Sequence, residues 1–144
     1  MLVQQILKSK GDDGVVTVTA DARVEDAART LAERRIGGLV VSSDGTTPEG
    51  ILSERDIVRS LALRGPKCLQ ETVAEMMTRN PVCCTRQDTS DAVLSRMTEG
   101  RFRHMPVVEE GKLVGIVTIG DVVKARLQEL AMEKNALEGM IMGH

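Results

Sequence analysis

A motif of seven residues, Gly-apolar-apolar-[Ser/Thr]-x-x-Asp, occurs twice in this chain of 144 residues. The two copies are Gly50-Ile-Leu-Ser-Glu-Arg-Asp56 and Gly115-Ile-Val-Thr-Ile-Gly-Asp121. The sequence around it repeats as well, at an offset of 66 residues before a turn and of 65 residues after it. Repetition on this scale predicts two copies of one supersecondary unit. Equivalent pairs include Val16 and Val82, Arg35 and Arg101, Val41 and Val107, and Gly50 and Gly115.

Each copy has the pattern β-α-β-β-α and is preceded by a short helix. Helices are expected at residues 2–9, 54–63, 72–77, 89–100 and 120 to about 138, and one more follows Asp21 as its cap and ends at Gly37-Gly38. Strands are expected at residues 15–18, 39–42, 49–52, 81–84, 105–108 and 112–117. A small open sheet cannot cover both of its faces alone, so the two units should pack together around a pseudo-twofold axis. The fold class is α/β (α+β), with units at 1–71 and 72–144.

The composition argues against several classes of function. One Phe and no Trp or Tyr leave no stacking platform for single-stranded nucleic acid. The net charge of −2 and the scattered basic residues give no electrostatic footprint for DNA, so a nucleic-acid partner is not expected. No apolar run approaches a membrane span, and the N-terminus lacks the apolar centre of a signal peptide. A cytoplasmic protein without membrane contact is therefore expected.

The three cysteines, Cys68, Cys83 and Cys84, do not form a disulfide framework, because their number is odd and two are adjacent. Neighbouring residues of a strand point to opposite faces, so Cys83 and Cys84 are not expected to share a metal. A buried strand is also a poor place for a nucleophile. We interpret all three as small apolar residues in a reducing compartment.

The repeated motif has two chemical interpretations. Ser53 or Thr118 with the Asp three residues later is a helix capping box. The same Asp, one turn after a strand, can accept hydrogen bonds from the two hydroxyls of a ribose, and the helix N-terminus beside it favours an anion. Cap and ligand contact use different lone pairs of the carboxylate, so both roles stay open at Asp56 and Asp121.

The repeat resembles the cystathionine-β-synthase (CBS) domain, and nearly the whole chain resembles a tandem CBS pair, or Bateman module. The two copies of the motif carry this resemblance, together with Arg103-His-Met-Pro-Val-Val108 and Val73-Ala-Glu-Met-Met-Thr-Arg-Asn-Pro81. The resemblance leaves no room for a catalytic domain. It therefore implies a stand-alone, non-enzymatic module without a catalytic cofactor or metal.

The resemblance further implies that nucleotides bind in two clefts between the units. One cleft would hold Ser53 and Asp56 with Asn80 and Val82, and the other Thr118 and Asp121 with Gly14 and Val16. The segments just before the central strands would complete both clefts. These segments are Ile36, Gly37 and Gly38 in the first unit and Phe102, Arg103 and His104 in the second, and the neighbouring Met105 and Ile119 are expected to contribute as well.

The two copies differ at those segments. Arg103 and His104 offer cationic and hydrogen-bonding groups for phosphate, so we expect the cleft of Asp121 to be the stronger one. Gly37 and Gly38 offer only backbone and space, which would admit the second half of a dinucleotide such as NAD(H). Phe102 is either a core residue or an adenine contact.

The expected function is a regulatory module that binds an adenine nucleotide, with AMP first and ATP, ADP or NAD(H) as alternatives, and reports adenylate state to an unidentified protein. Three other interpretations stay open. One is a ligand-free interaction module, and a second is an enzyme related to IMP dehydrogenase, against which the absence of a barrel and of a Cys/His or Ser/His constellation argues. The third is binding of double-stranded nucleic acid through Arg34, Arg35, Arg101 and Arg103, which the resemblance allows and the acidic balance disfavours. The last turns of the C-terminal helix, with Met140, Ile141 and Met142, predict a homodimer contact.

Overall fold

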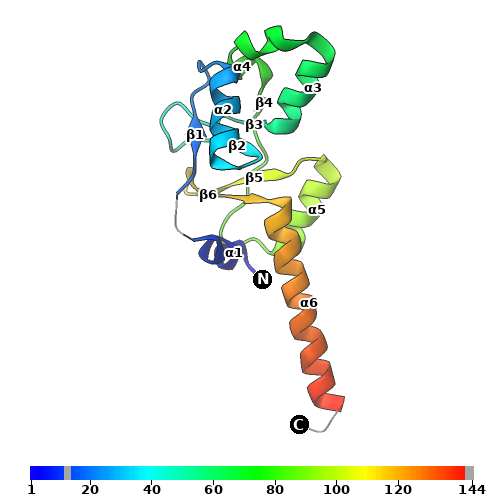
Figure 1. The fold of residues 1–144 in the computed structure, drawn as a ribbon. Coiled ribbons are helices and arrows are strands. Elements are labelled where there is room, and N and C mark those ends of the chain that lie inside the picture. The colour runs from blue at the N-terminus through cyan, green and yellow to red at the C-terminus, as the bar shows by residue number, and fades with distance from the viewer. Residues whose placement is uncertain (12–13, 142–144) are drawn as a thin grey trace.

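The computed structural model describes residues 1–11 and 14–141, which form two stacked units and a long helix that projects from the second (Figure 1). Among the described helices, none combines the length and the apolar character that a bilayer span requires. The first unit is a four-stranded sheet in the order β1-β2-β3-β4, covered by helices. Its elements are β1 (Thr17–Val18), α2 (Val24–Arg34), β2 (Gly38–Val41), β3 (Gly50–Ser53), α3 (Glu54–Arg64), η1 (Pro66–Gln70), α4 (Val73–Met76) and β4 (Thr78–Arg79).

The second unit contains a two-stranded antiparallel sheet, β5-β6. The hairpin turn at Glu110-Gly111 is tight because both residues have a positive φ, of 52° and 78°. Helix α6 follows β6 without a break and extends well beyond the body of the unit (Figure 1). The elements of this unit are α1 (Val3–Lys10), α5 (Ser90–Gly100), β5 (His104–Glu109), β6 (Lys112–Thr118) and α6 (Ile119–Ile141).

Strand register confirms the repeat residue by residue. In the first unit Gly38 pairs with Ser53 and Val41 with Gly50. The second unit pairs His104 with Thr118 and Val107 with Gly115, which are the residues at the offsets of 66 and 65. The parallel pairing of Val18 with Val41 likewise has its counterpart in the bridge between Cys84 and Val107. The mixed α/β fold of two equivalent units is therefore confirmed.

The two short helices that precede the repeats are exchanged between the units. Val3 and Ile6 of α1 are buried in the core of the second unit, whereas Val73 of α4 is buried in the core of the first. The division at residues 71 and 72 stays a prediction about the repeats, but the hydrophobic cores do not follow it. Each core is closed by the helix that precedes the other repeat in the sequence.

Backbone hydrogen bonds hold this exchange symmetrically. The Val24 amide at the start of α2 donates to the Glu71 carbonyl at 2.9 Å, and the equivalent Ser90 amide of α5 donates to the Met1 carbonyl at 2.8 Å. The first amide of each short helix donates in return, from Val73 to Ala22 at 2.8 Å and from Val3 to Asp88 at 2.9 Å. These bonds satisfy amides that a helix start leaves without a partner.

Three local predictions are wrong. The strand expected at 81–84 is absent, because Asn80 has a φ of 49° and Pro81 has no amide to donate. Only Cys84 bridges to β5, and the extra edge strand is β4 instead. Asp21 does not cap α2, which begins after Arg23 without a side-chain cap. Gly37-Gly38 does not end α2, since Arg35 already ends it in the left-handed conformation and Gly38 begins β2.

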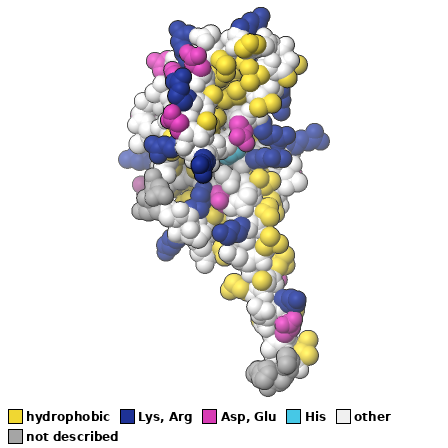
Figure 2. Space-filling view, viewed as in Figure 1, with side chains coloured by type: hydrophobic (Ala, Val, Ile, Leu, Met, Phe, Trp, Pro, Cys, Tyr) yellow, Lys and Arg dark blue, Asp and Glu magenta, His cyan; other side chains and the backbone are white. Residues whose placement is uncertain are grey.

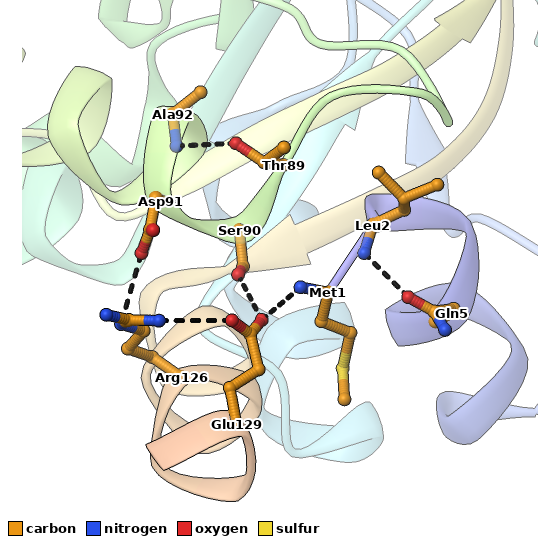
Figure 3. A network of polar contacts seen from close by, with 9 residues as sticks. All are labelled: Met1, Leu2, Gln5, Thr89, Ser90, Asp91, Ala92, Arg126 and Glu129. Carbon is orange, nitrogen blue, oxygen red and sulfur yellow. Dashed lines mark hydrogen bonds and ion pairs between the residues drawn. The ribbon is translucent and has the colours of Figure 1, made fainter. Parts of the chain in front are cut away.

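The base of α6 is fixed by a polar network around Glu129 (Figure 3). The Glu129 carboxylate accepts hydrogen bonds from the Met1 amine and from the Ser90 hydroxyl, the latter at 2.7 Å. Arg126 donates to Glu129 at 3.1 Å and forms an ion pair with Asp91 at 3.2 Å. Helix α6 is therefore attached to α1 and α5 through its first three turns, and the rest of the helix projects freely.

Candidate functional site

A cavity of about 260 Å³ lies where the two units meet. The first unit contributes the end of β3 and the start of α3, and the second contributes the segment between α5 and β5. Segments that are distant in the sequence thus form one concave site with both polar and apolar walls, as small-molecule sites do. The residues that line it are Ile51, Ser53, Arg55, Asp56, Arg59, Thr78, Asn80, Pro81, Val82, Gly100, Arg101, Phe102, Arg103 and His104.

Ser53 and Asp56 form a capping box at the start of α3. The Ser53 hydroxyl accepts a hydrogen bond from the Asp56 amide at 3.2 Å, and the Ser53 amide donates to Asp56 Oδ2 at 2.9 Å. Ser53 also donates its hydroxyl proton to the same oxygen, at 3.0 Å. In the described part of the chain, the hydrogen bonds of this carboxylate all go to Oδ2. The capping interpretation is therefore confirmed, and Oδ1 remains available to a ligand.

Four arginines line this cavity: Arg55 and Arg59 from α3, and Arg101 and Arg103 from the segment between α5 and β5. Among the described residues, none of the four forms an ion pair with a carboxylate. Lys and Arg side chains gather at one edge of the molecule, at the level where the units meet (Figure 2). A chain with a net charge of −2 thus concentrates unneutralised positive charge at one cavity, which favours an anionic ligand.

His104 lies in the middle of the boundary between the units, and its imidazole covers Gly38. A β-carbon at residue 38 would stand 2.8 Å from His104 Cδ2, and one at residue 37 would stand 3.4 Å from Nε2. Burial lowers the pKa of His104, outweighing the nearby carboxylates of Glu54 and Asp56, which act to raise it. The neutral imidazole therefore fills the space beside Gly38, whereas room for a second nucleotide half beside Gly37 stays a prediction.

The second copy of the motif is capped in the same way but is closed by a lysine. The Thr118 amide donates to Asp121 Oδ2 at 2.9 Å, and the Thr118 hydroxyl accepts from the Asp121 amide at 3.2 Å. Lys10 Nζ, at the end of α1, lies 2.8 Å from the same Oδ2 and donates to the Ile116 carbonyl at 2.9 Å. Burial of Asp121 opposes ionisation, yet Lys10 and the Thr118 amide outweigh it and lower the pKa of Asp121.

From the sequence, Arg103 and His104 were expected to make the cleft of Asp121 the stronger one, and this ranking stays a prediction. Both residues line the cavity of Asp56, together with the predicted Asn80, Val82 and Phe102. Phe102 packs against the core of the second unit and also lines this cavity, so its contact with adenine stays a prediction.

The remaining predicted residues lie elsewhere. Gly14 lines a separate cavity beside α1, and Ile36 and Gly37 line a groove between α2 and α3. Met105 is fully buried, and Val16 and Ile119 pack against the two cores. Thr118 and Asp121 line none of these three cavities.

Sequence reasoning missed Arg55, Arg59 and Arg101. Arg55 and Arg59 are four residues apart, so a helix that starts at Glu54 places them on one face next to Asp56. That spacing was visible in the sequence. Arg101 was not recognisable in this way, because it ends α5 with a φ of 57° and only the fold turns it toward α3.

The cysteines show no sign of catalytic use. Burial raises the pKa of Cys83, and burial together with the Asp88 charge raises the pKa of Cys84 to about 12. Both thiols therefore stay protonated near neutral pH and are poor nucleophiles. The described residues contain no cluster of His, Cys, Asp and Glu that could hold a metal ion.

Comparison with known proteins agrees with the geometry. The sequence model of the CBS domain matches residues 11–63 and 73–128. The chain is 31% identical to the mitochondrial CBS domain-containing protein CBSX3 of Arabidopsis thaliana, over 98% of this chain and 72% of that protein. Several other curated plant relatives are longer, and the chain spans only 22–24% of their length.

Solved structures extend the likeness to three dimensions. The CBS-domain containing protein ATU1752 from Agrobacterium tumefaciens is 46% identical, with a TM-score of 0.82 over 88% of this chain and 99% of that one. The CBS domain protein PAE2072 from Pyrobaculum aerophilum, complexed with AMP, is 28% identical, with a TM-score of 0.76 over 92% and 99%. The two matched repeats and the shared fold show that the chain belongs to the CBS domain family, as a tandem pair of CBS domains.

Proposed function

We propose that this chain is a regulatory module that binds an adenine nucleotide, AMP in the first place, in the cavity of Ser53 and Asp56. The observation that carries the proposal is the composition of that cavity. A carboxylate with one available oxygen shares the cavity with four arginines that have no carboxylate partner among the described residues, and both units contribute. The complex of PAE2072 with AMP supports the same ligand class.

Each part of a nucleotide has a chemically matched group in the cavity. Asp56 Oδ1 and the Ser53 hydroxyl suit the two ribose hydroxyls. The arginines and the start of α3 suit the phosphate, since guanidinium groups bind phosphate in a bidentate way and a helix N-terminus favours anions. Val82 is 48% exposed and, with Phe102, offers an apolar wall for the adenine ring.

Binding in this cavity would act on the packing of the two units. Asp56 and Ser53 belong to the first unit, whereas Arg101 and Arg103 belong to the second. A bound nucleotide would therefore bridge the units, and its presence would be reported through their relative position to a protein partner. We propose binding rather than catalysis and a cytoplasmic location, which the protonated thiols and three free cysteines support.

Calorimetric titration with AMP, ADP, ATP and NAD(H) tests the proposal, with a matched pair of variants. Asp56→Asn keeps an acceptor for the Ser53 amide but removes the charge, and AMP affinity should fall about tenfold, the loss typical of a charged hydrogen bond. Asp121→Asn makes the same change at the equivalent residue, where Lys10 occupies the carboxylate, and should leave AMP affinity unchanged. Absence of binding by every nucleotide at millimolar concentration would leave the ligand-free interaction module as the function.

The arginines make a second comparison informative. Affinity should rise from adenosine to AMP, because the phosphate adds negative charge beside four arginines, and this gain should shrink at high salt. S-adenosylmethionine, which carries a positive sulfonium in place of phosphate, should bind weakly. Arg103→Ala should reduce the difference between adenosine and AMP, while the exposed Arg34 of α2, which does not line the cavity, supplies the control Arg34→Ala.

A further inference from the structure

Helix α6 carries an apolar stripe with the spacing of a coiled coil. The positions are Val123, Leu127, Leu130, Lys134, Leu137 and Ile141, separated alternately by four and three residues. This alternation is the heptad pattern of a and d positions, with Leu127, Lys134 and Ile141 at a and the others at d. Lys134 is the single polar residue of the stripe.

The stripe is exposed and lies away from the body of the protein. Of the ten large apolar side chains that are exposed among the described residues, seven belong to α6. The exposed fractions on the stripe are 62% for Leu127, 59% for Leu137 and 83% for Ile141. The buried residues of α6, Val122 and Ala125, lie on a different face, about a third of a turn from the stripe at 100° per residue. The contacts of α6 with α5 and β6 therefore leave the stripe uncovered.

We propose that this stripe pairs with the same stripe of a second copy of the chain, with the two helices antiparallel. In a parallel pair Lys134 would face Lys134 of the second copy inside the core, and Glu133 would face Glu138 of the second copy at both edges. These like charges oppose a parallel pair, since flanking charges decide orientation in coiled coils.

The antiparallel pair removes most of these conflicts. It stacks Val123 on Ile141, Leu127 on Leu137 and Leu130 on Lys134 of the second copy, so the two lysines no longer meet. The long aliphatic part of Lys134 covers Leu130 while its ammonium reaches solvent.

The edges of the antiparallel pair are complementary as well. Lys124 faces Glu138 of the second copy on each side, and Ala131 meets Ala131 at the centre, where small side chains let the helices approach. One like-charge contact, between the two copies of Glu133, remains beside Lys134. The charge pattern thus selects a second copy as the occupant and fixes its direction. Met140 and Ile141, predicted as dimer contacts, flank and end this stripe, whereas Met142 lies outside the described residues.

Light scattering on the purified chain tests the pairing through its mass. The wild-type chain should have twice the mass of 15.6 kDa, and Leu127→Glu should be monomeric. Met132→Glu is the matched control, because Met132 is on the same helix and 66% exposed but lies off the stripe, and this variant should stay dimeric. A monomeric wild-type chain at 100 µM, or equal behaviour of the two variants, would overturn the proposal and leave the stripe to a different protein.

Disulfide trapping tests the direction, in chains whose half-buried Cys83 is replaced by serine. When Leu127→Cys chains are mixed with Leu137→Cys chains, oxidation should yield only the mixed dimer, because these two positions meet only in an antiparallel pair. Disulfide dimers of Leu127→Cys with itself would instead show a parallel pair. Lys124→Glu should weaken the dimer, and adding Glu138→Lys in the same chain should restore it.

Discussion

The imidazole of His104 lies so close over Gly38 that a β-carbon at residue 38 would stand 2.8 Å from His104 Cδ2. Gly38 pairs with Ser53 and His104 with Thr118, at the motif ends of their respective hairpins. The missing side chain of Gly38 leaves the room that the His104 imidazole occupies at the boundary. The glycine at residue 38, which suggested an empty space in the first unit, thus accommodates the bulky His104 side chain of the second unit.

Gly38→Ala should destabilise the protein by about 1–3 kcal/mol, the usual cost of overpacking a core. It should also lower nucleotide affinity, because His104 lines the cavity proposed to bind the nucleotide. Gly37→Ala is the control, since its β-carbon would stand at 3.4 Å from His104 Nε2 and needs only a small adjustment. Chemical denaturation of Gly38→Ala with and without His104→Ala measures the coupling, and an undiminished cost in the double variant would contradict this explanation.

Nucleotide binding should be accompanied by proton uptake near pH 6–7. His104 is neutral because burial holds its pKa below the usual value, and a phosphate nearby would raise that pKa toward or above about 6.5. Titration calorimetry of AMP in buffers of different ionisation enthalpy measures the protons taken up. His104→Gln should remove the uptake, and equal uptake by wild type and variant would place the titrating group elsewhere.

The same shift predicts how stability depends on pH. The folded-state pKa of His104 lies below the unfolded value of about 6.5, so the unfolded chain binds more protons and stability falls as the pH drops through this value. Thermal unfolding between pH 8 and pH 5 should therefore show a smaller loss for His104→Gln than for the wild type.

Lys10→Ala should open a second nucleotide site. Lys10 occupies the carboxylate of Asp121 at 2.8 Å, although Thr118 and Asp121 are arranged like Ser53 and Asp56. The wild-type chain should bind one nucleotide and the variant two, as measured by calorimetric stoichiometry. Lys8→Ala removes an exposed lysine of the same helix and should retain one. A single site in Lys10→Ala would mean that other features close the second cleft.

Glu129→Gln should lower the free energy of unfolding by about 1 kcal/mol near neutral pH, which is the usual contribution of one partly exposed charged contact. Hydrogen bonds from the Met1 amine and from Ser90 lower the pKa of Glu129. Its contribution is therefore complete above the unfolded value of about 4.3 and is lost as the pH falls through the lower folded-state pKa. Urea unfolding at pH 7 and pH 3 should show a smaller difference between wild type and variant at pH 3 than at pH 7. The exposed carboxylate of Glu99 supplies the control Glu99→Gln.

Periodicity and repetition in the sequence were sufficient to predict most of the helices and both hairpins, because helix faces and hairpin turns are local properties of the sequence. The two offsets matched the residues that pair within one hairpin to those that pair within the other. The capping boxes were also local, since Ser53 and Asp56 need only each other.

The failures concern contacts between distant segments. The start of α2 is satisfied by the Glu71 carbonyl rather than by Asp21, and no local pattern encodes such a bond. The cleft that contains Arg103 depends on how the second unit faces the first, which intra-unit motifs do not specify. The closure of Asp121 by Lys10 required knowing that α1 crosses to the second unit.

The exchange of α1 and α4 has a consequence for how this chain can be divided. A fragment of residues 1–71 would lack Val73, which is part of the core of the first unit. It would also carry α1 without the core of the second unit, against which the apolar face of α1 packs. The complementary fragment would lose Val3 and Ile6 from its core in the same way. We therefore expect the two repeats to unfold as a single cooperative unit, because each core contains a helix that precedes the other repeat in the sequence.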